Sequence, residues 1–156
     1  MSFQITPIIE AEELLNIFND PGLIIIDASG NANAKLFYDE KHISGALFID
    51  LNLQLADVKA NPADGGRHPL PLVQIFADTI AKSGIQKDSH IVIYDHNNGA
   101  NAASRFWWML KAIGHQKVQV LNGGFNNAEK NGIPINNQIV HAKIAEPYFV
   151  ETWLLP

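Results

Sequence analysis

The sequence has 156 residues, of which 47% are hydrophobic and 17% charged, and its formal net charge is -5 at pH 7. This length and apolar content suit one domain with a buried core. Basic residues are scattered, which argues against nucleic acid as a partner, and no apolar run is long enough for a membrane span or signal peptide. We therefore expect a cytoplasmic domain that binds neither nucleic acid nor membrane.

The sequence contains no cysteine. This excludes disulfides, thiolate metal sites and every mechanism that uses a Cys nucleophile from this chain. The six histidines also lack the i, i+4 spacing of two metal ligands on one helix. We expect no metal and no cofactor.

Helical and strand patterns alternate through the first half of the chain. We expect an edge strand at 3–7, a helix at 9–18, a buried strand at 23–26, a helix at 33–41 and a strand within 42–50. Several Pro and Gly residues in 51–71 predict a long surface loop, and loops of this length are usually functional. Apolar residues at helical spacing then predict a helix at 72–83.

The second half is organised around residues 90–124. The apolar run 91–94 ends at Asp95, a polar turn follows, and 100–111 has a helical pattern. In a parallel sheet, the loop at the carboxyl end of a strand faces the ligand crevice, and the next helix points its N-terminal amides there. The loop expected at this position consists of Asp95, His96, Asn97, Asn98 and Gly99.

Beyond this region we expect a strand at 118–121, a short helix at 125–130 and one more strand at 139–144. Strands that alternate with helices in this way predict an α/β fold. Its open, mostly parallel sheet should have four or five strands, with helices on both faces.

Five short segments carry a more specific signal. They are His42-Ile43-Ser44-Gly45-Ala46, the loop 65–71, the run 91–110, Gly114-His115 and the turn 121–125. In this order they resemble the rhodanese-like family, and in particular the N-terminal, non-catalytic domain of two-domain thiosulfate and 3-mercaptopyruvate sulfurtransferases. The resemblance implies a rhodanese-like domain over residues 1–135, with 136–156 as an interdomain linker or the start of a missing second domain.

The resemblance also implies a role for Asp95. In such enzymes the persulfide-forming Cys belongs to the second domain, and Asp95 occupies the matching position here. A carboxylate can accept the amide hydrogen bonds that would hold a persulfide anion, but it cannot carry sulfane sulfur. We expect a structural or interface domain of a sulfurtransferase, inactive alone. The alternative is a free-standing inactive module that binds a protein partner or a small anion.

Other site residues follow from the same comparison. The resemblance implies that His68 and the residue at an acidic position, here Asn52, lean towards the pocket of the second domain. Arg67 and His68 fit this role and simple loop anchoring equally well. Arg105 is expected to be a partly buried guanidinium paired with Asp27 or Asp95. The expected partner is a second rhodanese domain of the same polypeptide or another copy of the chain, and the sulfur donor stays open between thiosulfate and 3-mercaptopyruvate.

Overall fold

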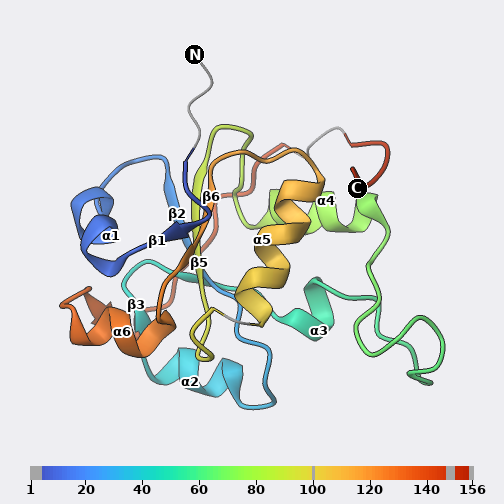
Figure 1. Cartoon of the computed structure of the whole chain (residues 1–156), viewed down its shortest axis with the longest axis horizontal. Coiled ribbons are helices and arrows are strands. Elements are labelled where there is room, and N and C mark those ends of the chain that lie inside the picture. Colours follow the sequence, from blue (N-terminus) through green and yellow to red (C-terminus); the bar gives the residue numbers. More distant parts are fainter. Residues whose placement is uncertain (1–4, 100, 147–149, 155–156) are drawn as a thin grey trace.

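The computed structural model describes residues 5–99, 101–146 and 150–154 (Figure 1). Within them, five parallel strands form one sheet in the order β1-β6-β5-β2-β4, and β3 pairs antiparallel with β7. The strands are β1 (Ile8–Ile9), β2 (Leu23–Asp27), β3 (His42–Ile43), β4 (Leu47–Phe48), β5 (His90–Tyr94), β6 (Val118–Leu121) and β7 (Ile135–Asn136). The helices are α1 (Ala11–Ile17), α2 (Ala34–Glu40), α3 (Leu51–Gln54), α4 (Val73–Lys82), α5 (Ala102–Ala112) and α6 (Gly124–Lys130).

The central strand β5 shows why the strands are continuous apolar runs. Ile91 and Ile93 enter one core, while Val92 and Tyr94 enter another, and all four side chains are buried. Successive side chains of a strand point to opposite faces, so a sheet covered on both sides requires apolar residues at every position. The predicted α/β class with a mostly parallel sheet is confirmed.

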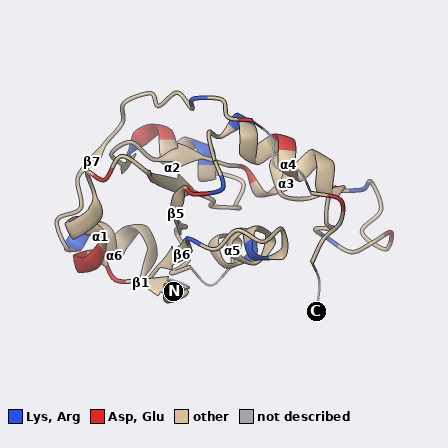
Figure 2. Cartoon of the chain, turned by 90° about the horizontal axis from the view of Figure 1, so that it is seen from above, with Lys and Arg blue, Asp and Glu red and all other residues tan. Residues whose placement is uncertain are grey.

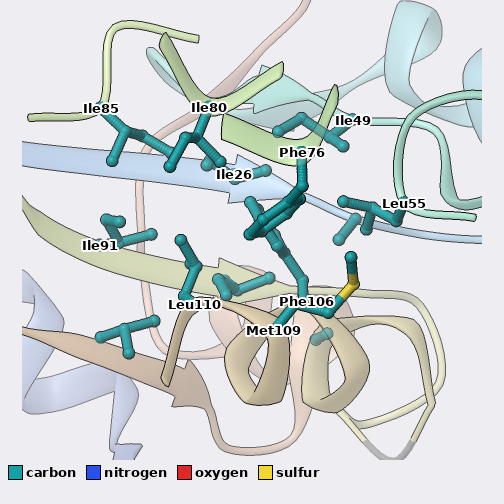
Figure 3. Close-up of a cluster of buried hydrophobic side chains, with 14 of the residues drawn as sticks. Ile26, Ile49, Leu55, Phe76, Ile80, Ile85, Ile91, Phe106, Met109 and Leu110 are labelled. Atoms are coloured by element: carbon teal, nitrogen blue, oxygen red, sulfur yellow. The ribbon is translucent and has the colours of Figure 1, made fainter. Parts of the chain in front are cut away.

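Two layers of helices cover the sheet. On one face, α3, α4 and α5 pack over β2 and β5, and the rings of Phe76 and Phe106 meet edge to face at 6.1 Å (Figure 3). On the other face, α1 and α6 cover a second core that includes Leu14 and Phe125. Each helix buries an apolar stripe, and this burial of apolar surface is the largest contribution to the stability of such layers.

Three sequence expectations about elements are corrected. No strand forms at 139–144; the strand after α6 is instead β7, which pairs with β3. The first strand is Ile8–Ile9 rather than 3–7, of which residues 3 and 4 lie outside the described part. The loop expected from residue 51 begins with the short helix α3. Asp50 caps α3 by accepting hydrogen bonds from Asn52 N and Leu53 N at 2.8 and 2.9 Å.

Charged residues are dispersed over several elements, in agreement with the scattered pattern of the sequence (Figure 2). No helix in the described ranges is long and apolar enough to cross a membrane. The described part of the tail lies against the domain: Ala145 N donates to Ala81 O at 2.8 Å, and the Trp153 ring packs on Phe76 at 5.2 Å. The domain boundary near residue 135 stays a prediction.

Gly124 provides a test of how tightly α6 closes on the central strand. Its φ is +61°, and a Cβ there would lie 2.4 Å from the Asp95 carbonyl oxygen. Gly124→Ala should lower the free energy of unfolding by about 3 kcal/mol or more, because a left-handed conformation and a backbone clash add. Urea denaturation measures this loss.

Gly132→Ala is the matched control for that substitution. Gly132 has a φ of +79°, but a Cβ added there would have no neighbouring heavy atom within 4 Å. It should lose only about 1 to 2 kcal/mol, from conformation alone. Equal losses in the two variants would show that the approach of Gly124 to Asp95 contributes nothing.

Candidate functional site

Asp95 lies directly after β5 and is only 2% exposed. Its Oδ1 accepts hydrogen bonds from Asn97 N at 2.9 Å and Gly99 N at 2.7 Å, and its Oδ2 accepts one from Ala103 N at 3.0 Å. The third amide belongs to the first turn of α5, where the helix dipole also favours negative charge. The carboxylate therefore fills a cradle of backbone amides at the tip of the central strand, the position that the sequence predicts for this loop.

The backbone of the loop is fixed by close contacts. Asn98 and Gly99 have φ values of +57° and +79°. A Cβ on Gly99 would lie 2.7 Å from a methyl carbon of Val120. The Ser104 hydroxyl donates a hydrogen bond to the Gly99 carbonyl. These contacts fix the loop backbone with its amides directed at Asp95, so the fold itself determines the shape of the cradle.

A second buried carboxylate, Asp27, lies beside the loop at the end of β2. It is fully buried, and its Oδ1 accepts a hydrogen bond from Ser29 N at 2.9 Å. Its Oδ2 is 3.7 Å from His96 Nε2, and neither atom has a hydrogen-bond partner within the described ranges. The His96 ring stacks on Phe125 at 4.8 Å and on Phe37 at 5.8 Å. His96 thus connects the loop to α2 and α6.

The charge of Asp27 reaches two tyrosines. Burial and, second, the Asp27 carboxylate raise the pKa of Tyr38 to about 12, with a further contribution from Asp39. Burial and Asp27 also raise the pKa of Tyr94 well above its ordinary value. Both phenols stay neutral, and the Tyr38 hydroxyl donates to Ala46 O at 2.5 Å. These tyrosines act as structural hydrogen-bonding groups.

A pocket of about 300 Å³ opens beside the loop. Its lining is polar and includes Asp95 but no Lys or Arg among the described residues. It consists of Ser29, Gly30, Asn31, Asp95, His96, Asn97, Asn101 and Ala102. Asp95 already bonds to the loop amides, and Asp27 lies buried next to His96, so two carboxylates lie at or beside this pocket.

The predicted ion pair of Arg105 with Asp27 is wrong. Arg105 instead donates to the carbonyl of Leu55 from Nη2 at 2.9 Å and from Nε at 3.3 Å, and to the carbonyl of Pro69 at 3.5 Å. Asp27 faces His96, and the three amides satisfy Asp95. Arg105 lies in the first turn of α5, and its side chain points away from Asp95 to the two ends of the 55–69 loop. The carbonyl oxygens of Leu55 and Pro69 accept its hydrogen bonds there.

The second group of predicted residues does meet in space. His68 Nε2 lies 2.8 Å from Asn52 Oδ1, although the two residues are 16 positions apart. Partial burial, then the charges of Arg105 and Arg67, lower the pKa of His68. Arg67 is exposed beside it. The sequence missed Arg105 as a member of this group, because no local pattern relates α5 to a loop that precedes it by more than thirty residues.

The fold and this site together define an α/β domain in which a carboxylate closes an amide-lined loop at the tip of the central strand. The rhodanese-like domain family matches residues 10–131, and the chain belongs to that family. Bovine thiosulfate sulfurtransferase (Bos taurus) is 41% identical over 123 residues, which are 76% of this chain and 40% of the relative. A mouse 3-mercaptopyruvate sulfurtransferase (Mus musculus) is 35% identical over 127 residues, 77% of this chain and 41% of the relative.

Solved structures agree with the family assignment. The crystal structure of the 3-mercaptopyruvate sulfotransferase SseA from Escherichia coli superposes with a TM-score of 0.77 at 29% identity, covering 92% of this chain and 56% of that one. A 3-mercaptopyruvate sulfurtransferase from Leishmania major, at 23% identity and a TM-score of 0.74, covers 97% and 41% and supports the fold alone. The chain spans about 40% of the length of the curated relatives it matches.

The amide cradle predicts the behaviour of a thiol placed in it. Asp95→Cys should carry the chain's one cysteine, with a thiol pKa below about 7 rather than near 8.5, because the amides and the start of α5 stabilise the thiolate. Ultraviolet absorbance of the thiolate against pH measures this value. Ala60→Cys, in the exposed part of the 55–69 loop, is the control and should titrate normally. An ordinary pKa at position 95 would mean that the amides do not converge on the side chain.

The field of Asp27 predicts a change in tyrosine titration. Asp27→Asn should lower the pKa of Tyr38 from about 12, since removing a negative charge favours the phenolate, while burial keeps part of the rise. The Tyr38 ring resonances against pH report the value. Asp39→Asn removes the smaller contribution from an exposed carboxylate and should shift the pKa less. A larger shift from Asp39→Asn would contradict the placement of Asp27.

Proposed function

We propose that this chain serves as the non-catalytic rhodanese-like domain of a sulfurtransferase whose sulfur donor is thiosulfate or 3-mercaptopyruvate. The observation that carries the proposal is the Asp95 carboxylate in the amide cradle, at 2.7 to 3.0 Å from three backbone nitrogens. Support comes from the relatives that bear the names of these two activities.

The chemistry of the cradle explains why the chain alone would not transfer sulfur. Sulfane transfer needs a thiolate that attacks the donor and then carries the sulfur as a persulfide anion. Asp95 supplies an anion of the right charge, but its oxygens cannot take the place of that thiolate. The chain has no cysteine elsewhere, so a persulfide-forming residue must come from another domain.

On this proposal, the absence of cysteine favours one of the two expected partners. A second copy of this chain would also lack cysteine, so a homo-oligomer could not complete the reaction. A Cys-bearing second rhodanese domain would complete it. On this proposal, the present domain contributes an interface and the group Asn52, Arg67 and His68 to a pocket between the two domains.

The charges around that group suit an anionic donor. Arg67 is exposed next to His68, and partial burial followed by the charges of Arg105 and Arg67 lowers the pKa of His68. Thiosulfate and the 3-mercaptopyruvate carboxylate both carry negative charge, which guanidinium groups bind well. The two guanidinium groups near His68 therefore contrast with the pocket at residues 95–99, which no Lys or Arg lines within the described residues.

A chimera tests the proposal. Residues 5–146 would replace the matching segment of bovine thiosulfate sulfurtransferase, and thiocyanate formation from thiosulfate and cyanide would be measured. We expect the chimera to be active and His68→Gln to lower its kcat/KM about tenfold, the effect of one hydrogen bond in the site. The isolated chain should form no thiocyanate.

His141→Gln provides the matched control in the chimera, because His141 is exposed on the tail, in a different part of the chain from the 55–69 loop. It should leave kcat/KM unchanged. Thiocyanate formation by the isolated chain above background, or an active chimera that tolerates His68→Gln, would overturn the proposal.

A further inference from the structure

Arg105 joins α5 to both ends of one long loop. Its Nη2 donates to Leu55 O at 2.9 Å and to Pro69 O at 3.5 Å, and its Nε donates to Leu55 O at 3.3 Å. The two carbonyls are 14 residues apart in the sequence. We infer that Arg105 is a positioning residue that fastens residues 55–69 and thereby sets the Asn52–His68 pair, an inference whose functional meaning rests on the proposed function.

The loop needs such a fastening because it holds little structure of its own. Between α3 and α4 the described chain forms turns and bends but no further helix or strand. Its ends are joined by one backbone hydrogen bond, from Asp57 N to Pro69 O at 2.9 Å. Ordering a loop of this length costs conformational entropy, which contacts at its two ends must offset. The half-buried guanidinium lies at that closure point.

The geometry suits arginine in particular. Several N–H donors in a planar fork can reach two carbonyl oxygens at once, whereas the single ammonium of a lysine acts as a point charge. Hydrogen bonds from a charged donor are also stronger than neutral ones. Burial lowers the pKa of Arg105, but the guanidinium stays charged at any physiological pH. The fastening is therefore independent of pH.

This arrangement affects both the position and the protonation of His68. Its Nε2 bonds to the neutral Asn52 side chain from α3, which places the ring proton on Nε2 and leaves Nδ1 as an acceptor. The charged groups that act on the ring are Arg67 in the same loop and Arg105 on α5. Partial burial and then these two charges lower the pKa of His68, so Arg105 acts on the protonation of the imidazole as well as on its position.

Hydrogen exchange on the chain alone tests the fastening. Arg105→Gln should speed exchange of the Asp57 amide by tenfold or more, because the loop end loses charged hydrogen bonds. The amides of Met109 and Leu110 in α5 should not change. If they exchange faster by the same factor, the variant has lost global stability and the inference is overturned, as it is if the Asp57 amide keeps its wild-type rate.

Two further variants separate charge from hydrogen bonding. Arg67→Gln removes the neighbouring charge but no bond to Leu55 or Pro69, so it should raise the pKa of His68 while Asp57 exchange stays normal. Arg105→Gln should change both, and Arg105→Lys, which keeps a charge and one donor, should restore part of the protection. The His68 ring resonances against pH give the pKa. An unchanged His68 pKa in Arg105→Gln would overturn the inference.

The chimera connects this result with function. There, Arg105→Gln should lower kcat/KM as His68→Gln does, and the double variant should lose no more than either alone, because both remove the same placed imidazole. Full activity of Arg105→Gln beside an impaired His68→Gln would overturn the positioning role. Tolerance of His68→Gln would instead overturn the proposed function, while exchange and titration of the isolated chain still report on the fastening.

Discussion

The hydrogen bonds between the Asp95 carboxylate and three backbone amides organise the region where the sheet meets its ligand crevice. An amide group that is buried without a partner costs about 1 to 3 kcal/mol, so the loop after β5 requires an acceptor at its centre. Asp95 satisfies Asn97 N, Gly99 N and Ala103 N together. The packing of α6 depends on the same residue, since Phe125 N donates to the Asp95 carbonyl at 3.1 Å. One side chain and one carbonyl thereby tie β5, α5 and α6 together.

A second carboxylate beside the cradle affects the neighbouring electrostatics. Asp27 lies buried at the end of the adjacent strand, and its field and the surrounding burial keep Tyr38 and Tyr94 neutral. A sulfur-transferring loop holds its negative charge only on a thiolate or persulfide, in reach of the donor. Here the Asp95 carboxylate is buried within the loop. The amides of Asn97, Gly99 and Ala103 are already bonded to Asp95 and are therefore not open to a second anion.

The sequence was informative about the sheet and less so about side-chain partners. The runs 23–26, 91–94 and 118–121 predicted buried strands because a parallel sheet covered on both faces needs apolar residues throughout. Asp95 could be placed at a strand end for the same reason. The partner of Arg105 could not be found, because the facing direction of a helical residue depends on how α5 packs. A carboxylate such as Asp27 was the expected partner of Arg105, whereas in the structure Arg105 bonds to the carbonyls of Leu55 and Pro69.

The short elements were the least predictable. β3 and β7 have two residues each and depend on each other, so neither has a local signal. The helix α3 is one turn long and depends on the Asp50 cap. By contrast, the resemblance pointed to Asn52 and His68, and the structure brings their side chains to 2.8 Å. Motifs of this kind carry contacts between distant residues that periodicity cannot encode.

On the proposed function, the loop at Asp95 and the loop 55–69 have different roles in the domain. The Asp95 side chain fills the amide cradle, and the contacts of Asp95 join β5 to α5 and α6. The loop 55–69 lies outside it, carries the exposed positive charge of Arg67 and a neutral imidazole, and is joined to the scaffold through Arg105. The first turn of α5 contains both Ala103, which bonds to Asp95, and Arg105, which bonds to the loop. A change in the contact between Asp95 and α5 would therefore move the residue to which the loop is attached. The residue that cannot carry sulfur would in this way still determine where His68 stands.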